Sequence, residues 1–315
     1  MAVERFTRRR FLRTASAAIG FAAVPSVSIP DETKPAAISF GFSLYGMRKL
    51  PLSKALSVCK TIGYDGVELV GNKDWPCDPE KLGKSQRADI RKRLDGLGLS
   101  CAAIMENVHL TADAKTHRGN LDRLKRAAEL GHDVSPKQPP VIETVLGGRP
   151  AQWDTLKDGM AERLRDWAKV AEAGKTVVAI KAHVGGAVHT PRDAVWLMQS
   201  AKSRWIRLAY DYSHFQLWDF KLADSLRAMI EHTVFIHVKD SKGKRPKFRF
   251  VLPGEGSIDY ANYFSLLKKH HYRGPLVVEV SGQLHGKPGY DPIAAAKISY
   301  RNLAPKLKAA GIRNN

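Results

Sequence analysis

The feature that most constrains the fold is an alternation of short apolar stretches with amphipathic stretches, repeated eight times from Ile38 onward. The short stretches are rich in β-branched residues, which favours strands, and the longer ones carry apolar residues at helical spacing. Eight strand–helix units in about 280 residues are typical of a (β/α)8 barrel. A doubly wound sheet normally has fewer strands and a glycine-rich first turn, and the sequence shows neither. We therefore predict an α/β fold, a (β/α)8 TIM barrel, over residues 35–315.

The alternation also predicts the boundaries of the elements. The expected strands are 38–46, 66–70, 100–108, 141–147, 176–184, 206–214, 233–239 and 275–280. The expected helices are 52–62, 85–97, 118–130, 153–173, 191–201, 222–231, 260–270 and 292–310. A glycine follows each of the first four helices, where left-handed C-caps are common: Gly63, Gly98, Gly131 and Gly174. Two longer loops, 71–84 and 241–259, follow strands and are expected over the C-terminal end of the barrel.

Residues 1–34 are typical of an export signal rather than of the barrel. Thr7-Arg8-Arg9-Arg10-Phe11-Leu12-Arg13 precedes a small-residue apolar stretch from Ala15 to Val24, which is too short to span a membrane. The paired arginines resemble a twin-arginine signal, which predicts export of the folded protein to the periplasm. A basic amphipathic N-terminal helix is the alternative. The twin-arginine route often exports proteins with a cofactor already loaded, which favours a bound metal in this protein. No membrane span is expected in the mature chain.

The charge and the cysteine content limit the range of possible functions less than the motifs do. The net charge of +20 could indicate nucleic acid, an acidic polysaccharide or an anionic envelope as partner. The cationic residues are spread over nearly every expected helix without interleaved aromatics, however, so we predict a solvated exterior and no nucleic-acid partner. Cys59, Cys77 and Cys101 lack metal-type spacing and are expected to be free thiols, two of them in the core. A Cys59–Cys101 disulfide is the alternative. The sequence predicts no oligomeric state.

Ionisable residues gather where the expected strands end. In a barrel of this kind the C-terminal ends of the strands form one mouth, where chemistry is usually found. The carboxylates gathered at this mouth would repel one another and take up protons unless a cation lay between them. Mixed carboxylate and imidazole ligands suit Mn, Mg, Co or Zn. The strand-end residues are Glu68, Glu106, His109, Glu143, Lys181, His183, Asp211, His214, His237, Lys239, Asp240 and Glu279.

Five motifs lie at or near the ends of the expected strands. They are Gly63-Tyr64-Asp65-Gly66-Val67-Glu68-Leu69, Asp211-Tyr212-Ser213-His214, His237-Val238-Lys239-Asp240, Pro253-Gly254-Glu255-Gly256-Ser257-Ile258-Asp259-Tyr260 and Val277-Val278-Glu279. Together they resemble the motifs of the xylose-isomerase-like barrels, the superfamily of sugar (phosphate) isomerases, epimerases and endonuclease IV. The resemblance covers the chain from Ile38 to the C-terminus.

The resemblance implies a divalent metal held by Asp211, His237 and Glu279. It also implies that His214 touches substrate, and Glu68 and Lys239 are the further candidates for substrate binding. The fourth ligand of the superfamily is a strand-five Glu that also serves in acid/base catalysis. Lys181 stands at that position here.

The lysine at this position leaves three hypotheses open. Glu143 could supply the missing metal ligand, or His183 could complete the shell and leave Lys181 as a base with a lowered pKa. In the third hypothesis metal binding is lost, and Lys181 forms a salt bridge with Glu143 or Glu279. We expect Lys181, His183, His214 and Glu279 to be catalytic, and Glu143, Asp211, His237 and Glu279 to bind the metal.

These residues predict an enzyme that removes a proton next to a carbonyl on a small carbohydrate, as sugar isomerases and epimerases do. A metal would stabilise the enediolate as a Lewis acid. One alternative is a lyase acting on a 3-keto-glycoside with the same site, and another is a carbohydrate-binding barrel without activity. A nucleic-acid repair enzyme is a further alternative, but it would need a trinuclear zinc site with more ligands than the sequence offers.

Overall fold

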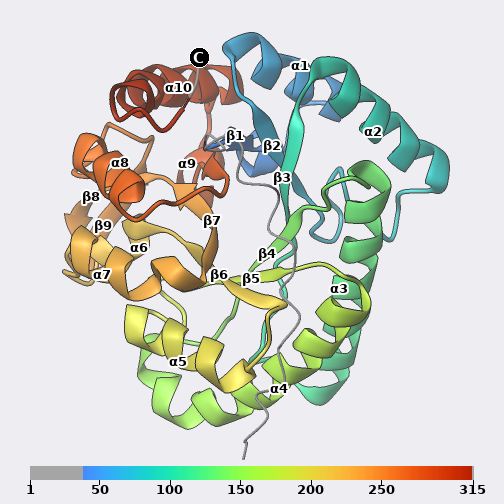
Figure 1. The fold of residues 1–315 in the computed structure, drawn as a ribbon, viewed down its shortest axis with the longest axis vertical. Coiled ribbons are helices and arrows are strands. Elements are labelled where there is room, and N and C mark those ends of the chain that lie inside the picture. The colour runs from blue at the N-terminus through green and yellow to red at the C-terminus, as the bar shows by residue number, and fades with distance from the viewer. Residues whose placement is uncertain (1–37, 314–315) are drawn as a thin grey trace, which may run out of the picture. The chain divides into compact units, whose positions relative to one another are not determined.

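The chain forms a closed barrel of eight parallel strands surrounded by helices (Figure 1). The computed structural model describes residues 38–313. The strands pair in the order β1-β10-β7-β6-β5-β4-β3-β2, and each pairing is parallel. The predicted (β/α)8 fold is therefore confirmed.

The barrel strands are β1 Phe40–Ser43, β2 Gly66–Val70, β3 Ser100–Met105, β4 Val141–Val145, β5 Val178–Lys181, β6 Ile206–Tyr210, β7 Thr233–Val238 and β10 Leu276–Val278. The helices are α1 Leu52–Ile62, α2 Lys84–Leu97, α3 Ala114–Val134, α4 Trp153–Ala173, α5 Pro191–Ala201, α6 Tyr212–Gln216, α7 Leu222–Met229, α8 Tyr260–Lys269, α9 Gly282–His285 and α10 Pro292–Ala309. Short 3-10 turns lie at Leu44–Met47, Pro150–Gln152 and Ile230–His232.

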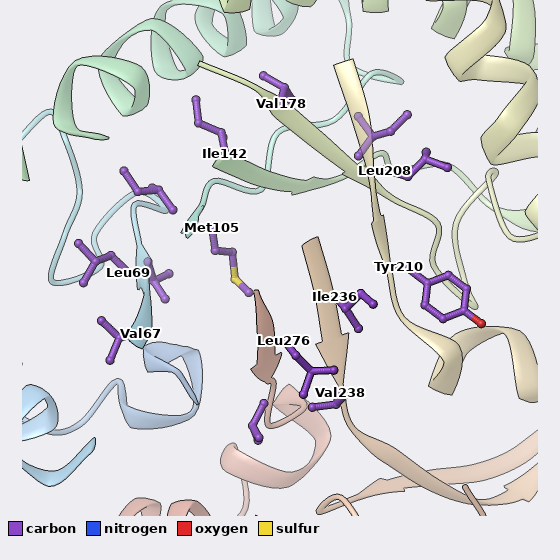
Figure 2. Close-up of a cluster of buried hydrophobic side chains, with 14 of the residues drawn as sticks. Val67, Leu69, Met105, Ile142, Val178, Leu208, Tyr210, Ile236, Val238 and Leu276 are labelled. Atoms are coloured by element: carbon purple, nitrogen blue, oxygen red, sulfur yellow. The ribbon is translucent and has the colours of Figure 1, made fainter. Parts of the chain in front are cut away.

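Alternation along the strands separates two buried layers. Leu276 and Val278 of β10 belong to the large cluster between strands and helices, whereas Val277 belongs to a small cluster inside the barrel. Figure 2 shows side chains of the large cluster, contributed by strands from β2 to β10. The inner cluster is Ala103, Ala179, Ala209, Phe235 and Val277. Because successive side chains of a strand face opposite ways, the residues two positions further along face inward as well.

Two helix ends differ from the prediction. Gly131 does not end a helix, because α3 continues to Val134. The helix begins after Asp113, whose carboxylate accepts hydrogen bonds from two backbone N–H groups. Gly174 follows α4 with a φ of −80°, so it is not a left-handed cap. Gly63 and Gly98 do adopt left-handed conformations, with φ of 109° and 59°.

The two segments that follow β6 and β7 also differ from the prediction. The sixth strand ends at Tyr210, and Asp211 then caps the short helix α6, so His214 lies on a helix and not on a strand. The segment after β7 was expected to be a loop, but it contains an antiparallel hairpin of β8 (Asp240–Lys244) and β9 (Lys247–Val251). Both differences matter for the site, because they bring additional side chains over the barrel end.

Three further predictions concern covalent and topological features. Cys59, Cys77 and Cys101 are free thiols, as expected, and all three are buried rather than two. Among residues 38–313, no helix combines the length and apolar character needed to cross a bilayer. The predicted signal, residues 1–34, lies outside the described residues.

Candidate active site

The site forms one layer above the apolar plug of the barrel. Lys181, Asp211, His237 and Glu279 each follow an inner-cluster residue by two positions, so the strand alternation turns them toward the barrel axis. Glu143 lies between outward residues of β4 and faces inward too. All of these side chains are buried, together with Glu68 and Lys239. The structure thus brings together seven of the twelve residues that were predicted from strand ends.

Lys181 lies at the centre of this cluster. Its Nζ is 2.9 Å from Oε1 of Glu143, 2.9 Å from Nδ1 of His237 and 3.4 Å from Oε2 of Glu279. Burial alone would lower the pKa of the Lys181 amine, but Glu143, Glu279 and Asp211 outweigh burial and raise it. These contacts favour the protonated ammonium of Lys181 over the base with a lowered pKa that the second hypothesis requires. Its salt bridges with Glu143 and Glu279 are those of the third hypothesis.

A second ammonium group lies on the other side of Glu279. Nζ of Lys239 is 2.5 Å from Oε2 of Glu279 and 3.0 Å from Oδ2 of Asp211. It also lies 5.0 Å from the centre of the Phe250 ring, which the β8–β9 hairpin supplies. Lys239 therefore joins the carboxylates at the ends of β6 and β10.

His237 links the two sides of the barrel. Because the Lys181 ammonium can only donate, Nδ1 of His237 accepts its hydrogen bond, and Nε2–H donates to Oε2 of Glu68 at 3.0 Å. Both ring nitrogens are thus engaged. Glu68 is fully buried behind His237, which places it where it orients the imidazole.

The carboxylates of the cluster differ in their ionisation. Burial raises the pKa of Glu143, and the attraction of Lys181 offsets this only in part. Burial would raise the pKa of Glu279 as well, but the ammonium groups of Lys181 and Lys239 outweigh it and hold that pKa well below its usual value. Glu279 is therefore ionised at neutral pH. With 6 % of its surface exposed, it is also the most accessible of these carboxylates.

His183 and His214 form a neighbouring pair with ring centres 4.2 Å apart. Burial and the nearby Lys239 lower the pKa of His183 to about 4, and they lower that of His214 well below its usual value. Backbone N–H groups donate to Nδ1 of each ring, from Gly185 to His183 and from Val184 to His214. In both neutral rings the hydrogen is therefore on Nε2, and Nε2 of His214 lies 3.4 Å from Oδ2 of Asp211.

Several functional contacts were not predicted from the sequence. Ser213 donates its hydroxyl to Oδ1 of Asp211 at 2.6 Å, and Phe250 contacts both Lys239 and the His214 ring. The spacing Asp-x-Ser is a signal for a helix cap and could have revealed Ser213. Nothing in the spacing of Phe250 could have revealed its position, because the hairpin was expected to be a loop.

Asp240 and Glu106 are ionisable strand-end residues that lie in other networks. The Asp240 carboxylate accepts backbone N–H groups from Gly254, Gly256, Ser257 and Ile258, which explains the motif around Gly254. Glu106 pairs with Arg123, whose Nε lies 2.7 Å from its Oε1. Both residues therefore hold loops at the barrel end in place.

Three of the four predicted metal ligands lie together. Donor atoms of Asp211, His237 and Glu279 lie within 4.8 Å of one another. Glu143 falls into a second set of this kind, with Glu68 and His237. The four residues thus do not form one coordination group, because Lys181 lies between Glu143 and Glu279.

The donor atoms of both sets are already in contact with nitrogen donors. Lys239 contacts Asp211 and Glu279 in the first set, and Lys181 contacts Glu143 and His237 in the second. Four buried carboxylate oxygens lack a hydrogen bond: Oε1 of Glu68, both oxygens of Glu143, and Oδ2 of Asp211. An ammonium nitrogen lies 2.9 Å from Oε1 of Glu143 and 3.0 Å from Oδ2 of Asp211. The imidazole that would complete the set with Glu68 and Glu143 has no free nitrogen. An ammonium group cannot ligate a cation. The residues present therefore do not fit the four-ligand metal site that the resemblance implies.

Comparison with known proteins agrees with the barrel fold. The sequence profile of the xylose isomerase-like TIM barrel family matches residues 56–303. The chain belongs to this family. L-ribulose-5-phosphate 3-epimerase of Escherichia coli is 24% identical over 267 residues, which cover 82% of this chain and 90% of the relative.

Solved structures show the same fold. The zinc-bound IOLI protein has a TM-score of 0.73 at 18% identity, and the match covers 87% of this chain and 99% of that one. The 3-keto-D-glucoside 4-epimerase of E. coli has a TM-score of 0.67 at 18% identity, covering 85% and 99%. The fold and the family predicted from the motifs are therefore confirmed, and the curated relative and the second structure are sugar epimerases.

Proposed function

We propose that this protein is a sugar isomerase or epimerase that removes and returns a proton at a carbon next to a carbonyl. The observation that carries the proposal is Glu279, the most accessible of the buried carboxylates, whose Oε2 is held by two ammonium groups at the barrel end. A deprotonated carboxylate at the barrel end can accept a proton from a substrate carbon placed next to it, as a general base does. The sugar epimerases among its relatives support the same chemistry.

The surrounding residues have distinct roles in this proposal. Glu279 takes the proton from the carbon, and the ammonium of Lys239 stabilises the negative oxygen of the resulting enediolate. His183, the more exposed of the two histidines, offers Nε2–H to a substrate oxygen. His214 is only 1 % exposed and Glu68 is fully buried, so we assign them to positioning His183 and His237. Return of the proton to the opposite face gives an epimer, and its return to the neighbouring carbon gives an isomer.

The experiment is deuterium exchange with a panel of sugars. The protein is incubated in D2O with free ketoses, their 5-phosphates and 3-keto-glucosides, and incorporation is followed by NMR. We expect deuterium at the carbon next to the carbonyl of one class, and a loss of about 10²–10⁴-fold in rate for Glu279→Gln. Glu231→Gln, an exposed residue, is the matched control. Loss of a β-substituent instead would identify a lyase, and binding without exchange would identify a carbohydrate-binding barrel.

We also propose that residues 1–34 direct export of the folded barrel. The paired arginines and the short apolar stretch that follows them support this proposal. Fusing these residues to a folded reporter tests it. Export of the reporter should be lost when Arg8 and Arg9 are both changed to Lys, and unchanged export would contradict the twin-arginine route.

A further inference from the structure

We propose that the buried ammonium groups of Lys181 and Lys239 take the place of a divalent cation, and that this enzyme binds no metal at its catalytic site. The proposal deepens the function proposed above and rests on it for its catalytic consequence. The absence of a bound ion is argued from the geometry of the cluster alone. The absence of the ion and the catalytic consequence can therefore be tested separately.

The first step is that the two ammonium groups contact the atoms an ion would need. Lys239 lies between Asp211 and Glu279, at 3.0 and 2.5 Å from their oxygens. Lys181 contacts Glu279 at 3.4 Å and His237 at 2.9 Å. All three donors of the set Asp211, His237 and Glu279 are therefore in contact with a positive nitrogen.

The second step is that every carboxylate of the cluster has a partner within the protein. Lys181 pairs with Glu143 and Glu279, and Lys239 pairs with Glu279 and Asp211. The remaining carboxylate, Glu68, accepts from His237. Repulsion between carboxylates was the reason to expect a cation, and the two lysines supply positive charge at the places where it is required.

The third step is that Lys181 cannot easily move away. It is the last residue of β5, a strand bonded to β4 and β6 on either side, and 2 % of its surface is exposed. Withdrawal of its ammonium would leave Glu143 buried without a positive partner, which is costly. An incoming ion would have to displace this group or accept it as a neighbour of like charge.

The chemical consequence is a change in how the enediolate is stabilised. The carbon–hydrogen bond breaks and Glu279 receives the proton. The electron pair of that bond forms the carbon–carbon double bond of the enediolate, and the π pair of the carbonyl moves onto its oxygen. Hydrogen bonds from ammonium groups then offset the charge on that oxygen, where a metal would act by coordination. The proton returns from Glu279 or from solvent, so the step needs no oxidant, reductant or co-reactant.

Metal content and metal affinity test the proposal without any substrate. The wild-type protein is expressed with added Mn²⁺, Co²⁺ and Zn²⁺, dialysed against a chelator, and measured by inductively coupled plasma mass spectrometry and by Mn²⁺ titration calorimetry. We expect substoichiometric metal and no Mn²⁺ isotherm. Lys181→Glu introduces a carboxylate at the fourth ligand position, and we expect it to bind Mn²⁺ at least about tenfold more tightly than the wild type.

Lys54→Glu makes the same charge change on the exposed face of α1 and is the control for non-specific attraction of cations. A stoichiometric ion in the wild-type protein that survives dialysis would overturn the proposal, and this measurement remains decisive if Lys181→Glu does not fold. A folded Lys181→Glu protein that binds Mn²⁺ no better than Lys54→Glu would contradict the inference that Lys181 stands in the place of a metal ligand. If the protein is metal-free but exchanges no sugar proton, only the proposed function fails.

Discussion

The ammonium nitrogen of Lys181 lies 2.9 Å from Oε1 of Glu143, and both side chains are buried inside the barrel. The two residues come from β4 and β5, which are adjacent strands. The contact therefore lies in a buried part of the site, where an unpaired charge costs more than it would on the surface.

Replacing Lys181 with Met should lower the free energy of unfolding by about 3–5 kcal/mol, because Glu143 then lacks its positive partner. Equilibrium unfolding in urea measures this change. The double variant Lys181→Met with Glu143→Gln should regain part of the loss, since the neutral amide no longer requires a cation. Equal stability of the single and double variants would show that the pair is not coupled.

Lys239→Met should shift the pH dependence of the reaction. Lys239 helps to hold the pKa of Glu279 below its usual value, so its removal should raise that pKa. The base must be deprotonated to act, and the acidic limb of the kcat/KM profile should therefore move to higher pH. Lys239→Arg keeps the charge and should leave the limb close to its original position. Superimposable profiles for Lys239→Met and the wild type would argue against Glu279 as the base.

Stability should fall between pH 6.5 and about 4 because of His183. The unfolded chain binds a proton at the ordinary histidine pKa of 6.5, whereas burial keeps His183 neutral in the folded state until about pH 4. Acidification across this window therefore favours unfolding, by about 3 kcal/mol for His183. Urea unfolding at several pH values measures the effect, and His183→Gln should flatten the curve. A His183→Gln curve as steep as that of the wild type would contradict it.

Asp240→Ala should destabilise the segment after β9. Its carboxylate accepts N–H groups from Gly254, Gly256, Ser257 and Ile258, and these donors would be left without that acceptor. We expect a loss of about 2–4 kcal/mol in the free energy of unfolding. Gly256→Ala should act similarly, because a Cβ there would collide with Oδ1 of Asp240. Gly96→Ala is the control, because open space surrounds that glycine. Exposed Gly289→Ala is unsuitable, because the φ of Gly289 is +75°.

The positions of the inward side chains follow largely from the sequence. A strand period of two, applied to Ala179 and Ala209, already turns Lys181 and Asp211 toward the same axis. Glycine patterns were less informative, since Gly131 lies within α3, which continues to Val134. The sequence pattern predicts a strand at His214, because the apolar run before Asp211 gives no sign that Asp211 begins a helix.

The sequence alone determined that the chain closes into an eight-stranded barrel and that acidic, basic and imidazole groups meet at its C-terminal end. Only the tertiary structure decided which groups pair. Lys181 could have served as a base, as a residue beside a metal site or as a partner in a salt bridge. These roles differ by a few ångströms in the distance between its Nζ and side chains on the neighbouring strands. Local sequence patterns fix the direction of a side chain, but the pairing of buried charges depends on the register between strands that are far apart along the chain.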